Sequence, residues 1–550
     1  MKLATTWKIL YLLGLGLLLL PAVARAQFTF TTNNGTIQIT RYYGTNDAVV
    51  VPSFINGLPV TSIAQFTFTC CNMTSVSLPE SITNIGDAAF ESSSYLTNLT
   101  IPSAIAHLGN GVFNECWSLT GISFPTNLMT IGDQAFQDCK SLSGLTLPAT
   151  VTSIGTGAFF KSGLTNMVVG ATLTNIGDYA FMGCAKLTNL VVNGQNPAYS
   201  SSGGVLFNKD KTVLCQYAAA PGSNSYLLPN GVTNIWNYAF YSCTNLNIVH
   251  ISDTVACIGS NAFNGCMLLT NINLGSNVSS IGTGAFQSSG LRSITLPSRL
   301  TMIADYLCYG CGNLTNVTIP AGVTNIGRSA FYQAGIANIA IPGSVATLGD
   351  YAFFSCPNLQ TIQLGDGIQR ISQFAFSSCY DVVSINIPNS VGSIGYGAFY
   401  YCTSLGFGPV TIGKGVTNIE QNAFGCCPFL RNVFFLGNAP AASGAFINDT
   451  VLRFYYLPGG KGWENGLEGI PATLWNPQII FADGNFGVRG DQFGFNITGT
   501  TNIPIVVEAS TNLNGPWVTL QSPTLTGGPF YFSDPQKTIY PRRFYRIRSP

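Results

Sequence analysis

Charged residues are scarce in this 550-residue chain: Asp, Glu, Lys and Arg make up 8% of it, against about a quarter of typical soluble domains. The 23 basic and 22 acidic residues leave a formal net charge of +1, so no broad field exists to attract nucleic acid or an anionic membrane. Histidine occurs only as His107 and His250, which removes most catalytic triads and zinc-hydrolase sites. We therefore expect no enzymatic activity, no cofactor, no metal ion and no nucleic-acid partner.

Long hydrophobic runs are also missing, apart from one at the start of the chain. Residues 9–20 are apolar, two lysines precede them, and Ala-Arg-Ala at 24–26 resembles a signal-peptidase site before Gln27. A run of twelve residues is shorter than the ~20 that span a membrane. We interpret residues 1–26 as a signal peptide and predict an exported protein, extracellular, at the cell surface or periplasmic, with no membrane span in the mature chain.

An internal repeat accounts for most of the sequence. A Phe-type position recurs every 22 or 23 residues, and a fixed period of this length is typical of solenoids in which each repeat forms one coil. The sixteen positions are Phe68, Phe90, Phe113, Phe136, Phe159, Phe181, Phe240, Phe263, Phe286, Cys308, Phe331, Phe353, Phe376, Phe399, Phe424 and Phe446. Two intervals differ: one of 25 residues before Phe424, and one of 59 before Phe240, which we interpret as one repeat plus an insertion of 36.

The repeat that ends at Phe331 shows how one coil forms. Residues 314–319 read Leu-Thr-Asn-Val-Thr-Ile, a strand whose Val317 and Ile319 point inward while Asn316 and Thr318 point outward. Pro320 cannot donate a hydrogen bond and closes this strand. A second, shorter arm follows before Phe331 returns to the core. The sequence therefore predicts a curved, β-rich solenoid of about 16 coils.

The repeat resembles the BspA-type bacterial leucine-rich repeat, whose pattern is similar to L-T-x-I-x-I-P-x-x-V-T-x-I-G-x-x-A-F-x-x-C. The resemblance covers about residues 36–447. It implies a secreted or cell-surface protein, often concerned with adhesion and with binding of partner proteins, and it implies no reaction.

These patterns divide the chain into four parts. After the signal peptide, residues 27–447 form the predicted leucine-rich repeat solenoid, interrupted at 193–229 by an insertion that we expect to project as a hairpin around a polar turn at 208–211. Residues 448–477 are predicted to be a cap and linker. Residues 478–550 alternate short β-type runs with Gly, Pro and Asn turns, which predicts a small all-β, sandwich-like domain. This last part resembles a module found on exported verrucomicrobial proteins.

Cysteine follows the same repeat, because eleven of the 16 cysteines stand three residues after a Phe-type position. The predicted structural ladder consists of Cys71, Cys116, Cys139, Cys184, Cys243, Cys266, Cys311, Cys356, Cys379, Cys402 and Cys427. A small apolar thiol suits an inward slot in every coil. Neighbouring coils would also bring the Cα atoms within disulfide range; we favour thiols, because each slot has two equivalent neighbours.

Acidic residues recur before the Ala-Phe step, at Asp87, Asp133, Asp178 and Asp350. A carboxylate repeated at the start of a turn is typical of a cap that accepts backbone N–H bonds, whereas a catalytic pair occurs once. We therefore interpret these aspartates as structural.

The outward strand positions remain as the candidate functional surface. We predict that they bind an extracellular protein or a glycan, and that the solenoid is monomeric. The candidate partner-binding residues are Asn98, Thr100, Asn189, Ile248, His250, Asn271, Asn273, Asn316, Thr318, Asn432 and Phe434. The alternatives are a structural role in the envelope or matrix, with the C-terminal domain as the docking part, and an ice- or crystal-binding surface.

Overall fold

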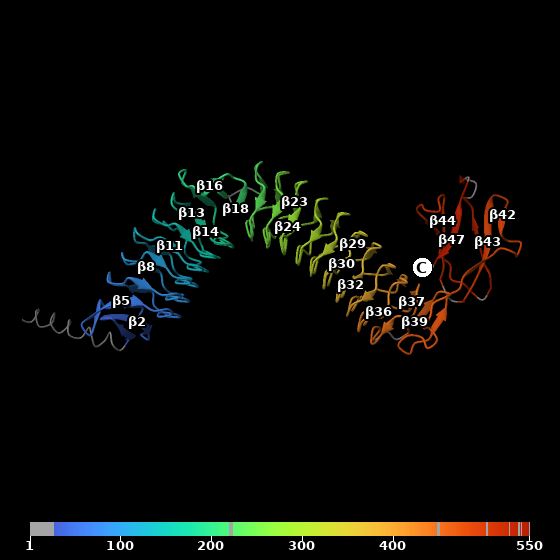
Figure 1. Cartoon of the computed structure of the whole chain (residues 1–550), viewed down its shortest axis with the longest axis horizontal. Coiled ribbons are helices and arrows are strands. Elements are labelled where there is room, and N and C mark those ends of the chain that lie inside the picture. Colours follow the sequence, from blue (N-terminus) through green and yellow to red (C-terminus); the bar gives the residue numbers. More distant parts are fainter. Residues whose placement is uncertain are drawn as a thin grey trace, which may run out of the picture. The chain divides into compact units, whose positions relative to one another are not determined.

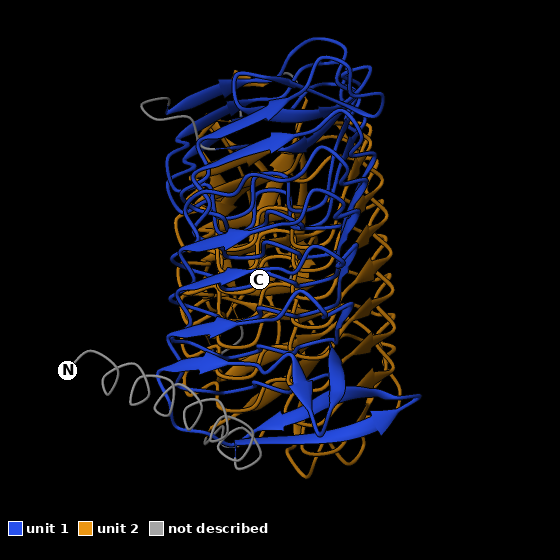
Figure 2. Ribbon diagram, turned by 90° about the vertical axis from the view of Figure 1, so that its left-hand side faces the viewer, with its two compact units in different colours: residues 1–278 blue, residues 279–550 orange. Residues whose placement is uncertain are grey.

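Two compact units, which divide after Val278, make up the chain, and we describe each separately (Figures 1 and 2). The computed structural model describes residues 27–218, 224–447, 451–501, 504–526, 528–536, 539–540 and 542–548. The named elements among these residues are all β-strands. The predicted signal peptide lies outside the described residues.

Within each unit the coils place their strands in two rows (Figure 2). The first row of the N-terminal unit consists of β3 (Ala48–Val50), β6 (Ser75–Ser77), β8 (Asn98–Thr100), β10 (Gly121–Ser123), β13 (Asn166–Val169), β15 (Asn189–Val192), β19 (Ser225–Leu227), β21 (Ile248–His250) and β23 (Asn271–Asn273). Its second row consists of β2 (Thr36–Tyr42), β5 (Leu58–Ile63), β7 (Asn84–Ile85), β9 (His107–Leu108), β11 (Thr130–Ile131), β12 (Ser153–Ile154), β14 (Asn175–Ile176), β18 (Val213–Gln216), β20 (Asn234–Ile235) and β22 (Cys257–Ile258).

The C-terminal unit repeats the arrangement. Its first row consists of β25 (Ser293–Thr295), β27 (Asn316–Thr318), β29 (Asn338–Ile341), β31 (Thr361–Leu364), β33 (Ile385–Ile387), β35 (Val410–Ile412), β37 (Asn432–Phe435), β39 (Arg453–Tyr456) and β40 (Ala472–Leu474). Its second row consists of β24 (Ser280–Ile281), β26 (Met302–Ile303), β28 (Asn325–Ile326), β30 (Thr347–Leu348), β32 (Arg370–Ile371), β34 (Ser393–Ile394), β36 (Asn418–Ile419) and β38 (Ala441–Ala442). The predicted β-solenoid is confirmed.

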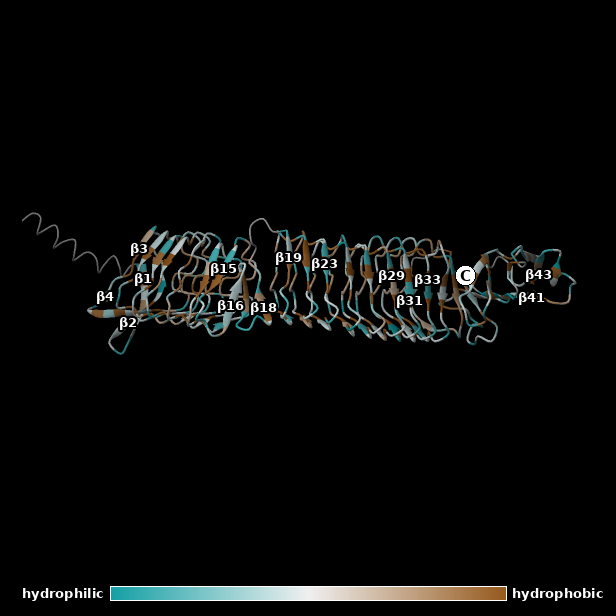
Figure 3. Ribbon diagram, turned by 90° about the horizontal axis from the view of Figure 1, so that it is seen from above, coloured by the Kyte–Doolittle hydropathy of each residue, from teal (hydrophilic) through white to brown (hydrophobic). Residues whose placement is uncertain are grey.

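Strand pairing within the rows is parallel, because every coil runs in the same direction. Strands β25 and β27, for example, pair Ile294 with Val317, and both side chains are buried. Asn316 and Thr318, on either side of Val317, are exposed as their alternation predicts. Figure 3 shows hydrophobic and hydrophilic residues intermixed within the coils of each unit.

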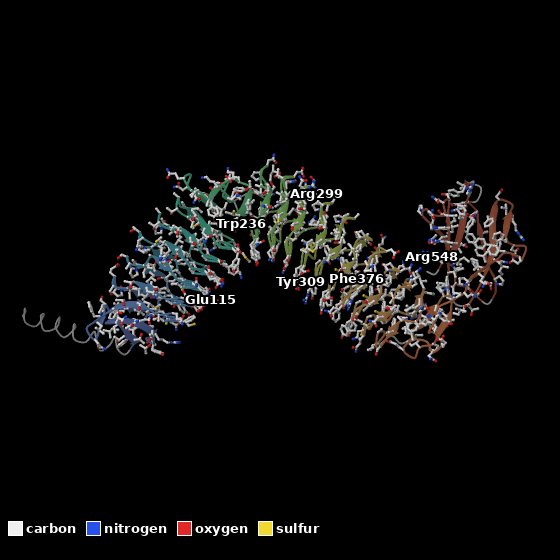
Figure 4. The ribbon with its side chains drawn as sticks, in the orientation of Figure 1. Glu115, Trp236, Arg299, Tyr309, Phe376 and Arg548 are labelled. Atoms are coloured by element: carbon white, nitrogen blue, oxygen red, sulfur yellow. The ribbon has the colours of Figure 1, made fainter. Side chains whose placement is uncertain are left out.

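The Phe-type residues stack into a buried column in each unit. Phe353 is fully covered and lies between Phe331 and Phe376, with ring centroids 5.1 and 5.3 Å away and ring planes 12° and 7° apart. Figure 4 labels Phe376 among the stacked coils. Burial of each such side chain contributes ~1.5 to 3 kcal/mol before conformational entropy is counted. No coil can bury its ring alone, so each depends on its neighbours.

Two residues in the left-handed region flank the column position and make the tight turn. Around Phe353 these are Tyr351, with a φ of 58°, and Ser355, with a φ of 55°. Such a conformation costs an L-residue roughly 1 kcal/mol. The backbone N–H of Phe353 donates to the carbonyl of Ala375 in the next coil, at 2.8 Å. Inter-coil hydrogen bonds of this kind hold the strained turn in place.

The 59-residue interval contains a coil that the sequence pattern did not reveal. Tyr217 occupies the column position: it is buried, stacks on Phe240 with centroids 5.0 Å apart, and donates its N–H to Ala239 O as the phenylalanines do. Tyr217 stands 23 residues before Phe240, so the long coil is the one of 36 residues between Phe181 and Tyr217.

The extra residues of this long coil form a packed hairpin. Strands β16 (Tyr199–Ser202) and β17 (Val205–Asn208) pair antiparallel, and β17 pairs antiparallel with β18, which itself pairs parallel with β20 of the second row. Val205, Leu206 and Phe207 are all buried. β17 and β18 form an antiparallel hairpin around the polar turn at 208–211, but the apolar side chains of β17 pack against the solenoid and do not project from it. Residues 225–227, which we assigned to the insertion, form the first-row strand β19.

Each ladder cysteine except Cys71 is buried, and most donate a hydrogen bond to the carbonyl of the column phenylalanine in the preceding coil. The thiol of Cys116 lies 3.1 Å from Phe90 O, and that of Cys402 lies 3.2 Å from Phe376 O. Ser93 replaces the cysteine in one coil, and its hydroxyl donates to Phe68 O at 2.6 Å. The slot thus holds a small side chain, usually a hydrogen-bond donor, although Ala334 occupies it after Phe331. All sixteen cysteines fall within the described residues, and none of them forms a disulfide.

Two of the four repeated aspartates, Asp87 and Asp133, cap the next coil rather than their own turn. The carboxylate of Asp87 accepts the N–H of Asn110 at 2.8 Å, and that of Asp133 accepts the N–H of Thr156 at 2.7 Å. In the coil between them, the amide oxygen of Asn110 accepts the N–H of Asp133 at 2.9 Å. Uncharged Asn serves equally well, so these side chains link neighbouring coils as hydrogen-bond acceptors.

The C-terminal residues form two small antiparallel sheets that pack on the first row. One sheet contains β41 (Gln478–Ile480), β42 (Gly487–Arg489), β43 (Gln492–Thr498) and β46 (Phe530–Asp534), and the other contains β44 (Val506–Ser510), β45 (Val518–Gln521) and β47 (Phe544–Arg548). Their buried side chains, which include Phe495 and Val507, form one apolar cluster with Phe434, Tyr455 and Trp475. The predicted all-β C-terminal part is confirmed, and it covers the end of the first row.

Replacing Phe353 by Ala should destabilise the C-terminal unit by ~3 to 5 kcal/mol, because the cavity has stacked rings on both sides. Urea unfolding, with hydrogen exchange across residues 331–376, measures the loss. Tyr380→Ala removes an exposed ring of the same unit and should change stability by no more than about 0.5 kcal/mol. Equal effects of the two substitutions would contradict the role of the column.

Replacing Cys116 by Ser should preserve more stability than replacing it by Ala, because Ser93 shows that a hydroxyl fits this slot. In the alanine variant the carbonyl of Phe90 keeps only the backbone N–H of Ser93 as a donor, and the lost hydrogen bond costs ~0.5 to 1.5 kcal/mol. Thermal unfolding of the two variants under reducing conditions compares them. If both lose the same amount, the hydrogen bond contributes nothing and the slot selects for size.

Truncation after residue 474 should make the protein aggregate, because it uncovers Phe434 and Tyr455 on an exposed sheet face. Size-exclusion chromatography with light scattering detects the aggregates. The same truncation with Phe434→Ser and Tyr455→Ser should remain monomeric. A soluble, monomeric truncation that retains both rings would show that the C-terminal sheets are not needed to cover them.

Candidate functional site

Four predicted residues lie side by side on the first row of the N-terminal unit. Strands β21 and β23 pair Ile248 with Asn271 and His250 with Asn273, and all four side chains are exposed. On the other side of β21, Leu227 of β19 pairs with His250 and is 71% exposed. A surface cleft of about 730 Å³ opens at the end of these strands and includes Leu227, His250 and Asn273 in its wall. We name this group of five residues the central patch.

The central patch combines an apolar surface with uncharged hydrogen-bonding groups. Leu227 and Ile248 supply the apolar area, and Asn271 and Asn273 each carry both a donor and an acceptor. Such a surface suits hydrogen bonding to a peptide backbone or to sugar hydroxyls, with apolar contacts beside it. Leu227 was not predicted, because it fell inside the expected insertion. The signal that could have identified it is the Leu228-Pro229 step, since a Leu-Pro step also ends the coils' strands at Leu78-Pro79 and Leu296-Pro297.

The other predicted residues of the N-terminal unit lie farther along the first row. Asn98 and Thr100 of β8 are exposed and line a second cleft, of about 570 Å³, over β6, β8 and β10. Asn189 is exposed on β15. Next to it along the same strands, Val168 pairs with Val191 and both are exposed. These residues share a face with the central patch but not its cleft.

In the C-terminal unit the predicted residues fall into two groups. Asn316, Thr318 and Asn432 are exposed on the first row. Phe434 was predicted to be available to a partner, and that prediction was wrong. Its side chain is only 3% exposed, because it packs with Tyr455 and Trp475 beneath the C-terminal sheets. Strand alternation correctly predicts that the side chain of Phe434 points outward, but it cannot predict that the C-terminal sheets cover this outward face.

A further cleft, of about 640 Å³, lies where the C-terminal sheets meet the first row, and we name it the end cleft. Asn386 and Thr411 line it from β33 and β35, and Arg546 and Arg548 line it from β47. Figure 4 labels Arg548 on the side of the C-terminal sheets that meets the coils. No sequence motif marks this cleft, because its residues are far apart in the chain and only the packing brings them together.

One buried carboxylate holds the two arginines of the end cleft. Glu508 is nearly covered and accepts hydrogen bonds from Nε of Arg546 and Nε of Arg548, both at 2.7 Å. Burial disfavours the charged form of Glu508, but the hydrogen bonds from Arg548 and Arg546 outweigh it and lower the pKa of this carboxyl. The guanidinium of Arg546 also stacks over Trp517, 4.3 Å from the ring centroid. Two positive charges and one negative charge leave this corner positive.

Within the described ranges, no group of three or more His, Cys, Asp or Glu side chains is arranged to bind a metal ion. The two histidines lie apart: His250 belongs to the central patch, and His107 lies on the second row, where Nδ1 is 2.8 Å from Thr130 Oγ1. The part of the chain that the structure describes also contains no helix of the length and apolar character needed to cross a membrane.

Comparison with known proteins agrees with the repeat geometry. A family model described as the BspA type leucine-rich repeat region matches residues 61–188, 219–337 and 324–452, in 6 copies. A leucine-rich repeat protein from Eubacterium ventriosum has a similar solved structure, with 26% sequence identity, a TM-score of 0.51, and coverage of 68% of this chain and 92% of that one.

A leucine-rich cell surface protein from Faecalibacterium prausnitzii is also similar, with 28% identity, a TM-score of 0.49, and coverage of 62% of this chain and 93% of that one. No curated protein sequence matches the chain. Because the family model matches well over half of the residues, this chain belongs to the BspA-type leucine-rich repeat family.

Proposed function

We propose that this protein is an exported interaction protein that binds an extracellular protein or glycan through the exposed face of its first row. The observation that supports this most directly is the central patch, where five exposed side chains lie on three neighbouring strands and three of them, Leu227, His250 and Asn273, border one cleft. Membership of a family of bacterial repeat proteins and the predicted signal peptide are consistent with a site of action outside the cytoplasm. No chemical reaction is proposed.

The face is suited to binding rather than to catalysis, because the inward-pointing residues of the same strands serve only to build the core. The buried residues of each strand are committed to the core, as are the column rings and the ladder cysteines. Only the outward positions are free to vary without loss of the fold. Among the outward residues of the central patch no side chain is an acid or a permanently charged base, so we expect hydrogen bonds and apolar contacts to dominate, with weak dependence on salt.

Replacing His250 and Asn273 together by Glu should reduce partner capture at least tenfold, because binding would bury two carboxylates and remove the water that solvates them. Arrays of extracellular proteins and of glycans, probed with the mature chain, identify the partner and measure the loss. Circular dichroism and the melting temperature should be unchanged, since both side chains are exposed.

The matched control is Asn234→Glu, which places the same charge at an exposed position of the second row in the same unit. Capture by this variant should equal that of the unsubstituted protein. Loss of capture in both would indicate a general charge effect, and undiminished capture by the His250 and Asn273 variant, extended to Asn98 and Asn316, would refute the proposal.

A further inference from the structure

The end cleft has the composition of a ligand site, although it lies outside the central patch. Its walls come from two parts of the C-terminal unit, the first row and the C-terminal sheets. One wall is apolar, with Leu457 and Trp475, and the opposite positions carry hydroxyl, amide and guanidinium groups. Natural small-molecule sites share this size and this mixture of an apolar wall with a few placed polar groups.

The positive charge of the end cleft is fixed in place. Because Glu508 is almost fully covered and engages both arginines, it sets their positions while the guanidinium groups themselves stay accessible: the side chains of Arg546 and Arg548 are 44% and 43% exposed. Arg546 is anchored to Glu508 through Nε and Nη2. A guanidinium held in this way presents its other N–H groups in a defined direction, which favours a carboxylate or a sulfate. Few other charges occur in a chain of this composition, so this pair is a distinctive feature.

Two further polar groups lie beside the arginines. Asn386 is exposed on β33, beside the strands that the C-terminal sheets cover, and its amide can both donate and accept hydrogen bonds. Trp475 is 6% exposed, and its indole Nε1 has no acceptor among the described residues. Because buried N–H groups are nearly always paired in native proteins, an acceptor from outside the chain is expected at this position.

From these features we propose that the end cleft binds an anionic sugar unit, one that carries a carboxylate or a sulfate. The anion lies against Arg546 and Arg548, the hydroxyl groups meet Asn386 and the neighbouring polar side chains, and the apolar face of the ring lies toward Leu457 and Trp475. This proposal rests on the proposed function in that it places a ligand on the first row, and it names the ligand class and a second location on that row.

The same arrangement explains why the C-terminal sheets are attached to this end of the row. Thr411 and Phe434 point outward on neighbouring strands and are both buried, so the sheets have converted a free face into the floor of a cleft. An open strand face binds a sugar weakly, because water competes for every hydrogen bond. A cleft with a second wall removes part of that water and strengthens the charge-assisted contacts.

Isothermal titration of the mature chain with four probes tests the proposal: a galacturonic acid trisaccharide, a sulfated galactan tetrasaccharide, neutral galactotriose and tetraglutamate. We expect binding of one or both anionic saccharides and none of the neutral one. Binding of only the carboxylated or only the sulfated probe identifies the anion and supports the proposal. Equal binding of galactotriose or of tetraglutamate would overturn it, as would the absence of any saccharide binding.

Substitutions then locate the site. Arg546→Ala should weaken binding of the anionic probe at least tenfold, because it removes a charge-assisted contact. That variant leaves Glu508 with one arginine, so its melting temperature is measured in parallel. Asn386→Ala disturbs no buried group and should weaken binding about fivefold. The matched control, Thr318→Ala, changes the equivalent outward position three coils earlier and should have no effect.

The outcomes separate this proposal from the proposed function. If Asn386→Ala and Arg546→Ala leave the affinity unchanged, the end cleft is not the site, whatever the central patch captures. If the two substitutions abolish saccharide binding while the central-patch variants still capture their partner normally, the end cleft stands and the proposed function of the central patch fails.

Discussion

Every coil of this protein depends on the coil beside it, and the dependence is concentrated at one residue. The column phenylalanine buries its ring between two others and donates its backbone N–H to the alanine carbonyl of the next coil, as Phe353 does to Ala375. The left-handed residues on either side of it, Tyr351 and Ser355, store strain, and their own N–H bonds to the next coil help to offset it. The cysteine thiols and the Asp and Asn side chains add further inter-coil hydrogen bonds. Stability is therefore a sum over interfaces between coils.

Sequence periodicity was enough to predict this architecture because the column residue is nearly always the same amino acid. Where a different residue takes that role, the prediction failed: Tyr217 supplies a buried ring as phenylalanine does, but its identity and the long interval before it concealed a complete coil. The direction of the outward side chains was also predictable, since alternation in a strand is geometric. The exposure of Phe434 was not, because it depends on sheets that follow in the sequence and fold back onto the row.

Residues that recur from coil to coil and residues that occur only once also differ in their roles. Repeated residues such as Cys116 and Asp87 face the core or the neighbouring coil, and their regularity reflects packing. The central patch and the end cleft both arise where the repeat is interrupted: Leu227 follows the long coil, and the end cleft forms where the C-terminal sheets meet the row. Such sites draw their residues from separate segments, so their chemistry is visible only once the fold is known.

The long coil between Phe181 and Tyr217 shows what the solenoid can tolerate. Its extra hairpin enters between the first-row strand β15 and the second-row strand β18, and β17 of the hairpin, not β14, is the neighbour of β18. Tyr217 and β18 nevertheless keep their register with Phe240 and β20 of the following coil. Only those two contacts have to be preserved for the next coil to form. Loops of new sequence could therefore be grafted at this corner of any internal coil, so that binding loops could be exchanged on an unchanged scaffold.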